Sequence, residues 1–293
     1  MLRAALALYG GGLYAEAMSD PAPLIDTHCH LAHGRLRAQV EAVLARAREA
    51  GVVVMVCAAG NLPDSSAALG LARAHDDVYA LAGVHPHDAG DAPDDYLARL
   101  ERMATDERNV AIGEVGLDYH YDFSPRDAQR EVFAAQLALA ARLDKRVVIH
   151  TREAFDDTLA ILADSDVDGA DVVFHSFTEG VERTRRVLDL GATVSYSGIV
   201  TFKKAAELRA AAATVPEDRL LVETDAPYLS PEPVRKHKTN EPAHVAHVAS
   251  RLADVRGCSV DELAERTTAN AVRLFGLQTP RRDAATRRKT RND

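Results

Sequence analysis

Short apolar segments of strand length alternate with longer amphipathic segments along most of the chain, and this alternation restricts the fold more than any other feature. Strands are predicted over 24–30, 52–58, 79–85, 110–117, 146–151, 172–177, 193–197 and 220–225. Apolar residues recur at helical spacing over 35–50, 65–75, 94–105, 125–143, 154–163, 181–190, 203–213, 242–256 and 259–275. Strands that are apolar along nearly their whole length are typical of a parallel sheet covered by helices.

Eight consecutive strand–helix units predict a closed (β/α)8 barrel, the TIM-barrel fold of the α/β class. The 293 residues suit one such domain, because these barrels commonly contain about 250 residues. An open nucleotide-binding sheet is disfavoured, because no G-x-G-x-x-G follows the first strand and no Walker A lysine is present. No linker interrupts the units before Thr279, so we expect one barrel domain over 18–278.

Both ends of the chain lack amphipathic spacing, and we expect both to be disordered. Residues 4–15 are uncharged, but twelve residues are too few to cross a bilayer. The sequence Met18-Ser19-Asp20 resembles a second translation start, so 1–17 is predicted to be a disordered extension or the product of an upstream start. The end of the chain, 279–293, is predicted to be a disordered basic tail, which could also steer an anionic substrate.

The composition argues against several classes of protein. Three scattered cysteines, Cys29, Cys57 and Cys258, without any C-x-x-C pair, do not form a disulfide framework and indicate a reducing, cytoplasmic compartment. A net charge of −9 argues against a general nucleic-acid coat, so a phosphate-bearing substrate requires local positive charge. No membrane association and no obligate protein partner are predicted.

Polar residues gather where the predicted strands end. These ends read D-T-H-C-H (26–30), H-P-H (85–87), G-E-V-G-L-D-Y (113–119), H-T-R-E (150–153), F-H-S-F (174–177) and E-T-D (223–225). Alternate residues of a strand share a face, so His28 and His30 point the same way. In a barrel all of these positions lie at the carboxyl end, where enzymes of this fold have their active sites.

This combination of imidazoles and carboxylates predicts a metal centre. A single histidine such as His175 is more often a hydrogen-bonded core residue, but several buried polar groups around one opening all need partners, and metal ions supply them together. Mixed nitrogen and oxygen ligands suit Zn²⁺ or Mn²⁺, and Mg²⁺ with bound water is also compatible. Asp26 either orients a ligand histidine or makes a structural hydrogen bond.

Six ordered motifs together resemble the TatD family of metal-dependent hydrolases, a branch of the amidohydrolase-type barrels that includes Mg²⁺- or Zn²⁺-dependent DNases. The motifs are L-I-D-T-H-C-H (24–30), G-V-H-P-H (83–87), I-G-E-V-G-L-D-Y (112–119), I-H-T-R (149–152), F-H-S-F (174–177) and E-T-D-A-P-Y-L (223–229). The resemblance extends over about 24–276. It implies a barrel that binds two divalent ions.

The resemblance also implies how the ligands are divided between the two ions. One ion is expected on His28, His30, Glu114 and Asp225, and the other on Glu114, His150 and His175. Glu114 is then the bridging carboxylate. Two ions that share a carboxylate activate a water and stabilise both oxygens of an in-line displacement at phosphorus. Asp225 is the candidate general base, so Asp225 and Glu114 are the predicted catalytic residues.

Three further residues are candidates for contacting the substrate phosphate, namely His85, Arg152 and Lys236. For Arg152, a structural salt bridge is an equal alternative. Members of the TatD family usually carry Arg-Gly-Lys/Arg-x-Asn-Glu-Pro after the last strand, whereas residues 236–242 read K-H-K-T-N-E-P. Lys236 therefore stands at the usual arginine position, which keeps a charge for phosphate but loses the planar bidentate fork unless Arg235 supplies it.

The leading functional hypothesis is a two-metal deoxyribonuclease that hydrolyses phosphodiester bonds of DNA, with single-stranded ends as its substrate. A second hypothesis is a hydrolase of carboxyl esters or amides, such as an aminoacyl-RNA deacylase, because the same metal-activated water attacks a carbonyl and the fold does not fix the substrate. A third is a metal-binding barrel without turnover. The complete ligand set argues against the third.

Overall fold

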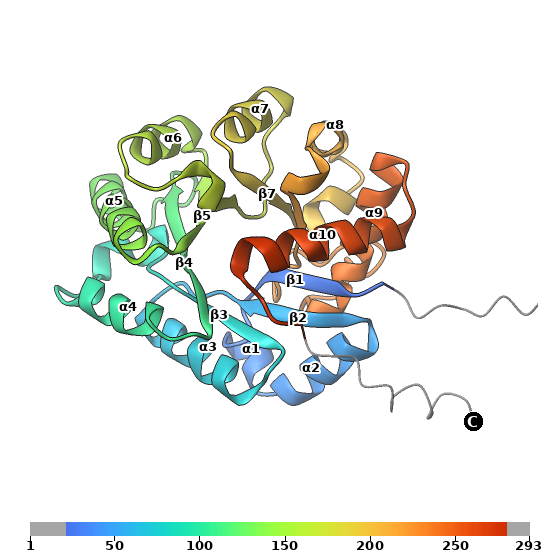
Figure 1. Ribbon diagram of the computed structural model, residues 1–293, viewed down its shortest axis with the longest axis horizontal. Coiled ribbons are helices and arrows are strands. Elements are labelled where there is room, and N and C mark those ends of the chain that lie inside the picture. The colour runs from blue at the N-terminus through green and yellow to red at the C-terminus, as the bar shows by residue number, and fades with distance from the viewer. Residues whose placement is uncertain (1–21, 280–293) are drawn as a thin grey trace, which may run out of the picture.

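Residues 22–279, which the computed structural model describes, form a ring of eight parallel strands surrounded by helices (Figure 1). The strands are β1 (Leu24–Cys29), β2 (Val52–Cys57), β3 (Val78–Ala82), β4 (Asn109–Asp118), β5 (Arg146–Arg152), β6 (Val172–Phe174), β7 (Thr193–Tyr196) and β8 (Leu220–Val222). They are hydrogen-bonded in sequence order, and a parallel bridge between Cys29 of β1 and Ala226, in the segment after β8, closes the ring between the first and last strands. The predicted (β/α)8 barrel is confirmed.

Helices cover the outside of the ring and one of its ends. They are α1 (Gly34–Arg37), α2 (Val40–Glu49), α3 (Leu62–Ala74), α4 (Tyr96–Ala104), α5 (Arg126–Leu143), α6 (Phe155–Ala163), α7 (Val181–Asp189), α8 (Ala206–Thr214), α9 (Val245–Arg256) and α10 (Val260–Phe275). Short 3₁₀ turns occupy Pro86–Asp91, Gly169–Asp171, Gly198–Thr201, Glu217–Arg219 and Pro242–His244. No helix within 22–279 is long and apolar enough to cross a membrane. The predicted extension 1–17 and the tail from 280 onward lie outside the described residues.

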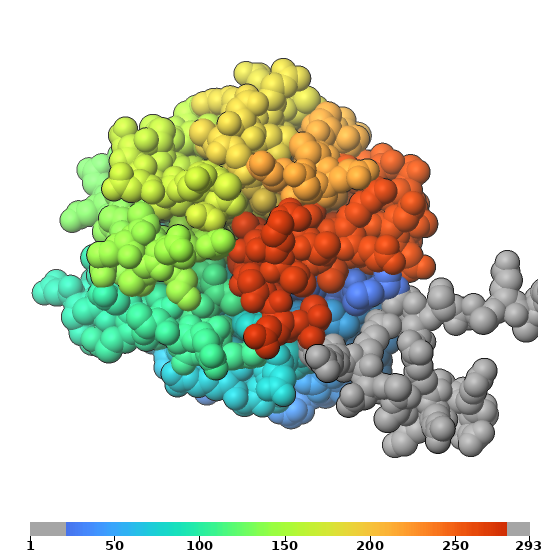
Figure 2. All heavy atoms as spheres, in the orientation of Figure 1, coloured from blue at the N-terminus to red at the C-terminus, as the bar shows by residue number. Residues whose placement is uncertain are grey.

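Two apolar layers hold the barrel together, and the strands separate them. The outer layer packs strands against helices and includes Cys29 and Cys57. The inner layer fills the barrel with side chains such as Val54, Val148 and Leu221. Helix α10 closes this inner layer at the amino ends of the strands, because its side chains pack on the interior residues and Asn270 donates to the Leu220 carbonyl. Figure 2 shows this helix over the middle of the face in view.

The main differences from the predicted elements lie at helix starts and strand ends. The helix predicted over 35–50 is divided into α1 and α2, because Gln39 leaves the helical region with φ of −132°. Strand β8 ends at Val222 rather than at Asp225, and β6 ends at Phe174 rather than at Phe177. The chain turns sharply after both strands, where Ser176 and Asp225 have positive φ. These turns redirect polar side chains into the open end of the barrel.

Candidate metal centre

Glu114 lies at the centre of the carboxyl end of the barrel, and its two carboxylate oxygens face different sets of imidazoles. Its Oε1 lies 2.8 Å from His175 Nε2, 3.1 Å from His150 Nδ1 and 3.3 Å from His85 Nε2. Its Oε2 lies 3.3 Å from His28 Nε2 and 3.6 Å from His30 Nε2. One carboxylate therefore separates two groups of potential metal ligands.

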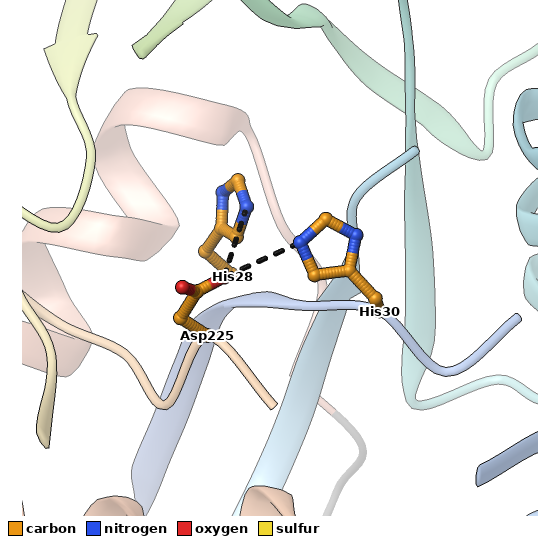
Figure 3. Close-up of side chains that lie close together, drawn as sticks. All are labelled: His28, His30 and Asp225. Carbon is orange, nitrogen blue, oxygen red and sulfur yellow. Dashed lines mark ion pairs between the residues drawn. The ribbon is translucent and has the colours of Figure 1, made fainter. Parts of the chain in front are cut away.

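The group on the Oε2 side also contains Asp225, which comes from the turn after β8. Asp225 Oδ1 lies 3.3 Å from His30 Nε2 and 3.9 Å from His28 Nε2, and the three side chains converge as Figure 3 shows. The backbone of Asp225 is fixed by a hydrogen bond from its N–H to the His28 carbonyl. Its φ of 56° turns the carboxylate toward the two histidines. A left-handed backbone at a non-glycine residue is often found at functional sites.

The group on the Oε1 side contains His85, His150 and His175. A close approach of β4 and β5 places His150 beside Glu114, and this approach requires Gly116. Gly116 has φ of +133°, and a Cβ at this position would collide with the His150 carbonyl. His85, which was predicted to contact the substrate, lines the cavity beside the metal centre and also lies among the candidate ligands with Glu114 and His150.

The carboxylates and imidazoles of this site shift one another's pKa values. Although burial opposes it, the imidazoles of His175 and His85 hold the pKa of Glu114 well below its usual range. Burial lowers the pKa of His28, and burial also lowers the pKa of His85 to about 4 against the attraction of Glu114. Although burial opposes the shift, the neighbouring carboxylates raise the pKa of His30, His150 and His175. A metal ion must therefore displace protons from these imidazoles when it binds.

His28 shows most directly that these residues fit a metal. Both ring nitrogens are buried without a hydrogen-bond partner among the described residues, and the ring stacks on His175 with centroids 4.0 Å apart. A buried imidazole without partners is costly, and a metal ion at Nε2 would satisfy one of the two nitrogens. His28 belongs to two candidate groups, one with His30 and Asp225 and one with Glu114 and His175.

Asp118 and His87 also belong to the site, although the sequence analysis gave them no role. Asp118 Oδ2 lies 3.1 Å from His150 Nε2 and 2.9 Å from His87 Nε2, and its Oδ1 accepts the N–H groups of His120 and Tyr121. Although burial opposes the shift, the hydrogen bonds from His150 and His87 lower the pKa of Asp118. A proton held on His150 Nε2 leaves Nδ1 free to face Glu114 and a metal.

Glu223 is a second residue that the sequence analysis left without a role. Its Oε1 lies 3.2 Å from His175 Nδ1 and accepts the Ser176 N–H at 2.8 Å, which orients the imidazole toward Glu114. Asp26 makes the structural hydrogen bonds that were one of its two predicted roles. It accepts the N–H and the hydroxyl of Thr224 at 2.9 and 2.6 Å, and so ties β1 to the segment that follows β8.

Comparison with known proteins decides the family. A sequence profile described as TatD related DNase matches residues 25–276. The chain belongs to the TatD family. The relative named uncharacterized metal-dependent hydrolase YcfH, from Escherichia coli K12, is 43% identical over 261 residues, covering 88% of this chain and 97% of its own. The TatD resemblance is therefore confirmed, and the protein is a metal-dependent hydrolase.

Two further TatD relatives extend this comparison. A Pantoea ananatis protein named 3'-5' ssDNA/RNA exonuclease TatD is 38% identical over 259 residues, covering 87% of this chain and 100% of its own. The crystal structure of YJJV, a TatD homologue from Escherichia coli K12, matches with a TM-score of 0.82 and 30% identity, covering 87% of this chain and 98% of that chain. Both cover the barrel and its metal centre.

The Asn-Glu-Pro part of the TatD motif after β8 has a structural role here. The buried Asn240 side chain donates to the Thr224 and Tyr228 carbonyls at 3.0 and 2.7 Å, and its oxygen accepts the Glu241 N–H. Glu241 in turn pairs with Arg46 of α2 at 2.6 Å. The motif therefore holds the segment that carries Asp225 against the barrel.

We expect Asn240→Ala to destabilise the protein strongly, because it leaves the buried Thr224 carbonyl and the partly buried Tyr228 carbonyl without the donor that they now have. The free energy of unfolding should fall by about 2–3 kcal/mol and the melting temperature by about 5–8 °C. Thermal denaturation of the variant beside Gln39→Ala, which removes an exposed carboxamide, measures this effect. Equal melting temperatures for the two variants would show that other contacts hold the segment.

A cavity of about 480 Å³ opens from the metal centre to solvent and is the place for a substrate. Arg152 lines it, lies over the Tyr121 ring at 4.7 Å and forms no ion pair with any residue of 22–279, so the structural salt bridge is not observed. Lys236 is exposed on the segment after β8 and does not line the cavity. Arg235 lies over Phe202 at 3.7 Å. The structure brings Arg152, but not Lys236, to the candidate metal ligands.

Proposed function

We propose that this TatD protein is a two-metal phosphodiesterase that removes nucleotides from the 3' end of single-stranded DNA. The observation that carries the proposal is the central place of Glu114, whose Oε1 faces His85, His150 and His175 while its Oε2 faces His28 and His30. One shared carboxylate between two ligand groups is the arrangement that two-metal phosphoryl hydrolases use. Relatives named 3'-5' ssDNA/RNA exonuclease support the substrate and the polarity.

The chain's own residues have defined tasks in this proposal. His28, His30 and Asp225 hold one Mg²⁺, Mn²⁺ or Zn²⁺ ion with Glu114, and His85, His150 and His175 hold the second. These ions polarise water and stabilise charge on the phosphate oxygens. Asp225 lines the cavity and accepts the proton of the attacking water. Asp118 and Glu223 keep the imidazoles of His150 and His175 in the orientation that their ligand nitrogens need.

The test is an assay of purified protein with 5'-labelled single-stranded DNA after removal of metals by a chelator. We expect no hydrolysis by the metal-free protein, and laddering from the 3' end after addition of Mg²⁺, Mn²⁺ or Zn²⁺. An aminoacyl ester is assayed in parallel. Hydrolysis of the ester without cleavage of DNA would replace the nuclease by an aminoacyl-RNA deacylase, and no turnover of either would favour the non-catalytic barrel.

Arg152 is expected to bind a phosphate of the substrate. Arg152→Ala should raise KM for single-stranded DNA by about 10-fold with little change in kcat, because a charge-assisted contact made in both ground and transition states is removed. Arg185→Ala on α7 is the matched control, since Arg185 is also exposed and lies outside the cavity. Steady-state kinetics on both variants measures the difference, and equal KM values would exclude Arg152 from phosphate binding.

A further inference from the structure

Within residues 22–279, the strongly exposed aromatic side chains are concentrated at one place. The large hydrophobic residues that are exposed within 22–279 are Tyr121, Phe123, Leu190, Tyr228 and Val260. Tyr121, Phe123 and Tyr228 are 47%, 68% and 42% exposed, and all three line the cavity above the metal centre. Exposed aromatic rings that gather at one site indicate a binding surface, because single exposed rings are otherwise scattered.

The three rings form two walls on opposite sides of the barrel. Tyr121 and Phe123 follow β4 and stack on each other, with centroids 5.2 Å apart and an interplanar angle of 19°. Tyr228 follows β8, four strands away around the ring of eight. Its ring lies 5.9 Å from that of His30, and that of Phe123 lies 4.8 Å from His87. The metal centre therefore lies between the two walls.

Each wall also carries an arginine beside its ring. The guanidinium of Arg152 lies 4.7 Å from the centroid of Tyr121, and that of Arg35 lies 5.8 Å from the centroid of Tyr228. Within residues 22–279 neither arginine takes part in an ion pair. A flat apolar face beside a free cation matches a nucleotide, whose base stacks while its phosphate needs a positive charge.

We propose that these walls are two nucleotide subsites, one of Tyr121, Phe123 and Arg152 and one of Tyr228 and Arg35. Each stacks one of the two bases that flank the scissile phosphate. The proposal rests on the proposed nuclease function and specifies how the substrate is recognised. Stacking on open rings accepts any base but requires that the base be unpaired, so the walls select single strands without reading their sequence.

The experiment compares intact single-stranded DNA with two modified strands, in which the terminal or the penultimate nucleotide lacks its base. For the wild-type protein, each missing base should lower kcat/KM by about 10-fold, mainly through KM. The double variant Tyr121→Leu with Phe123→Leu should cleave intact DNA with a kcat/KM about 10-fold below that of the wild type. For this variant, removal of the one base that normally stacks on Tyr121 and Phe123 should cause no further loss. The Tyr228→Leu variant should likewise show no further fall in kcat/KM when the other of the two bases is missing.

Two controls separate stacking from general apolar contact. Phe123→Trp keeps an aromatic face and should retain sensitivity to the missing base, whereas Val260→Ala removes an exposed apolar residue outside the cavity and should behave as wild type. Equal sensitivity to missing bases in wild type and leucine variants would overturn the proposal. The proposal would also be overturned if the leucine variants of both walls lost their response to the same missing base.

A binding measurement keeps this proposal separate from the proposed function. Metal-free protein is titrated into single-stranded DNA that carries the fluorescent base 2-aminopurine at its end. Stacking on a ring quenches this fluorescence, so we expect quenching by the wild type and its loss in at least one leucine variant. If no DNA is hydrolysed, the nuclease function fails while quenching still supports the subsites, and unchanged fluorescence overturns the subsites whether or not DNA is cleaved.

Discussion

Replacement of Glu114 by glutamine is expected to abolish hydrolysis and metal binding together. The carboxylate is the group that both ligand sets face, with Oε1 2.8 Å from His175 and Oε2 3.3 Å from His28. Glutamine keeps the volume but removes the charge and turns one oxygen into an N–H₂ group that cannot bind a cation. We expect kcat/KM to fall by about 10³-fold or more.

Elemental analysis of the Glu114→Gln protein measures the metal content beside the kinetics. The matched control is Glu107→Gln, which removes an exposed carboxylate in the turn before β4 and should leave both values unchanged. A Glu114→Gln protein that retained two ions per chain would contradict the bridging role. Loss of activity with full metal content would instead make Glu114 a participant in the chemical step only.

Asp225→Asn is expected to reduce turnover while the fold and at least one metal are retained. Asp225 lines the cavity and faces only the Oε2 group, so the Oε1 group of His85, His150 and His175 remains complete. Loss of a general base lowers kcat by about 10²-fold or more. Kinetics, metal analysis and melting temperature, each compared with Asp94→Asn on the surface, measure these effects. Near-normal kcat would leave Asp225 with a structural role.

Prediction from the sequence succeeded where the information was local. Each strand and helix has its own periodicity, so eight strand–helix units could be identified without any knowledge of their contacts. Parallel strands bring their carboxyl ends to one opening, so residues at strand ends such as His28, Glu114 and His175 could be expected to converge. Six ordered motifs then pointed to the TatD family, which the comparisons confirmed.

Prediction from the sequence was incomplete where a role depends on which side chain lies opposite. Glu223 and Asp118 both stand within the predicted motifs, but only the packing of neighbouring strands shows that they orient His175 and His150. His85 was expected to contact the phosphate, and the turn after β3 places it both at the cavity and 3.3 Å from Glu114, among the candidate metal ligands. A histidine can bind either a phosphate or a metal ion, so its role depends on the groups that lie next to it in the folded protein.

Substrate contacts were the least predictable feature, because they come from loops whose course depends on distant contacts. Lys236 was selected by its place in a motif, yet the segment after β8 is tied down by Asn240 and leaves Lys236 exposed outside the cavity. Arg35 and Tyr228 are far apart in the sequence, and Arg35 reaches the Tyr228 ring at the edge of the cavity only because the barrel closes between β1 and β8.

The sequence by itself determined the barrel and the family, and it indicated which histidines and carboxylates at the strand ends are candidate metal ligands, because hydrophobic periodicity and the positions of strand ends can be recognised along the chain. Only the tertiary structure decided how those residues are divided around Glu114, which carboxylates orient them, and which rings and cations face the cavity. The physical reason is that these roles depend on distances of about 3–5 Å between groups that are far apart in sequence, and only chain closure fixes such distances.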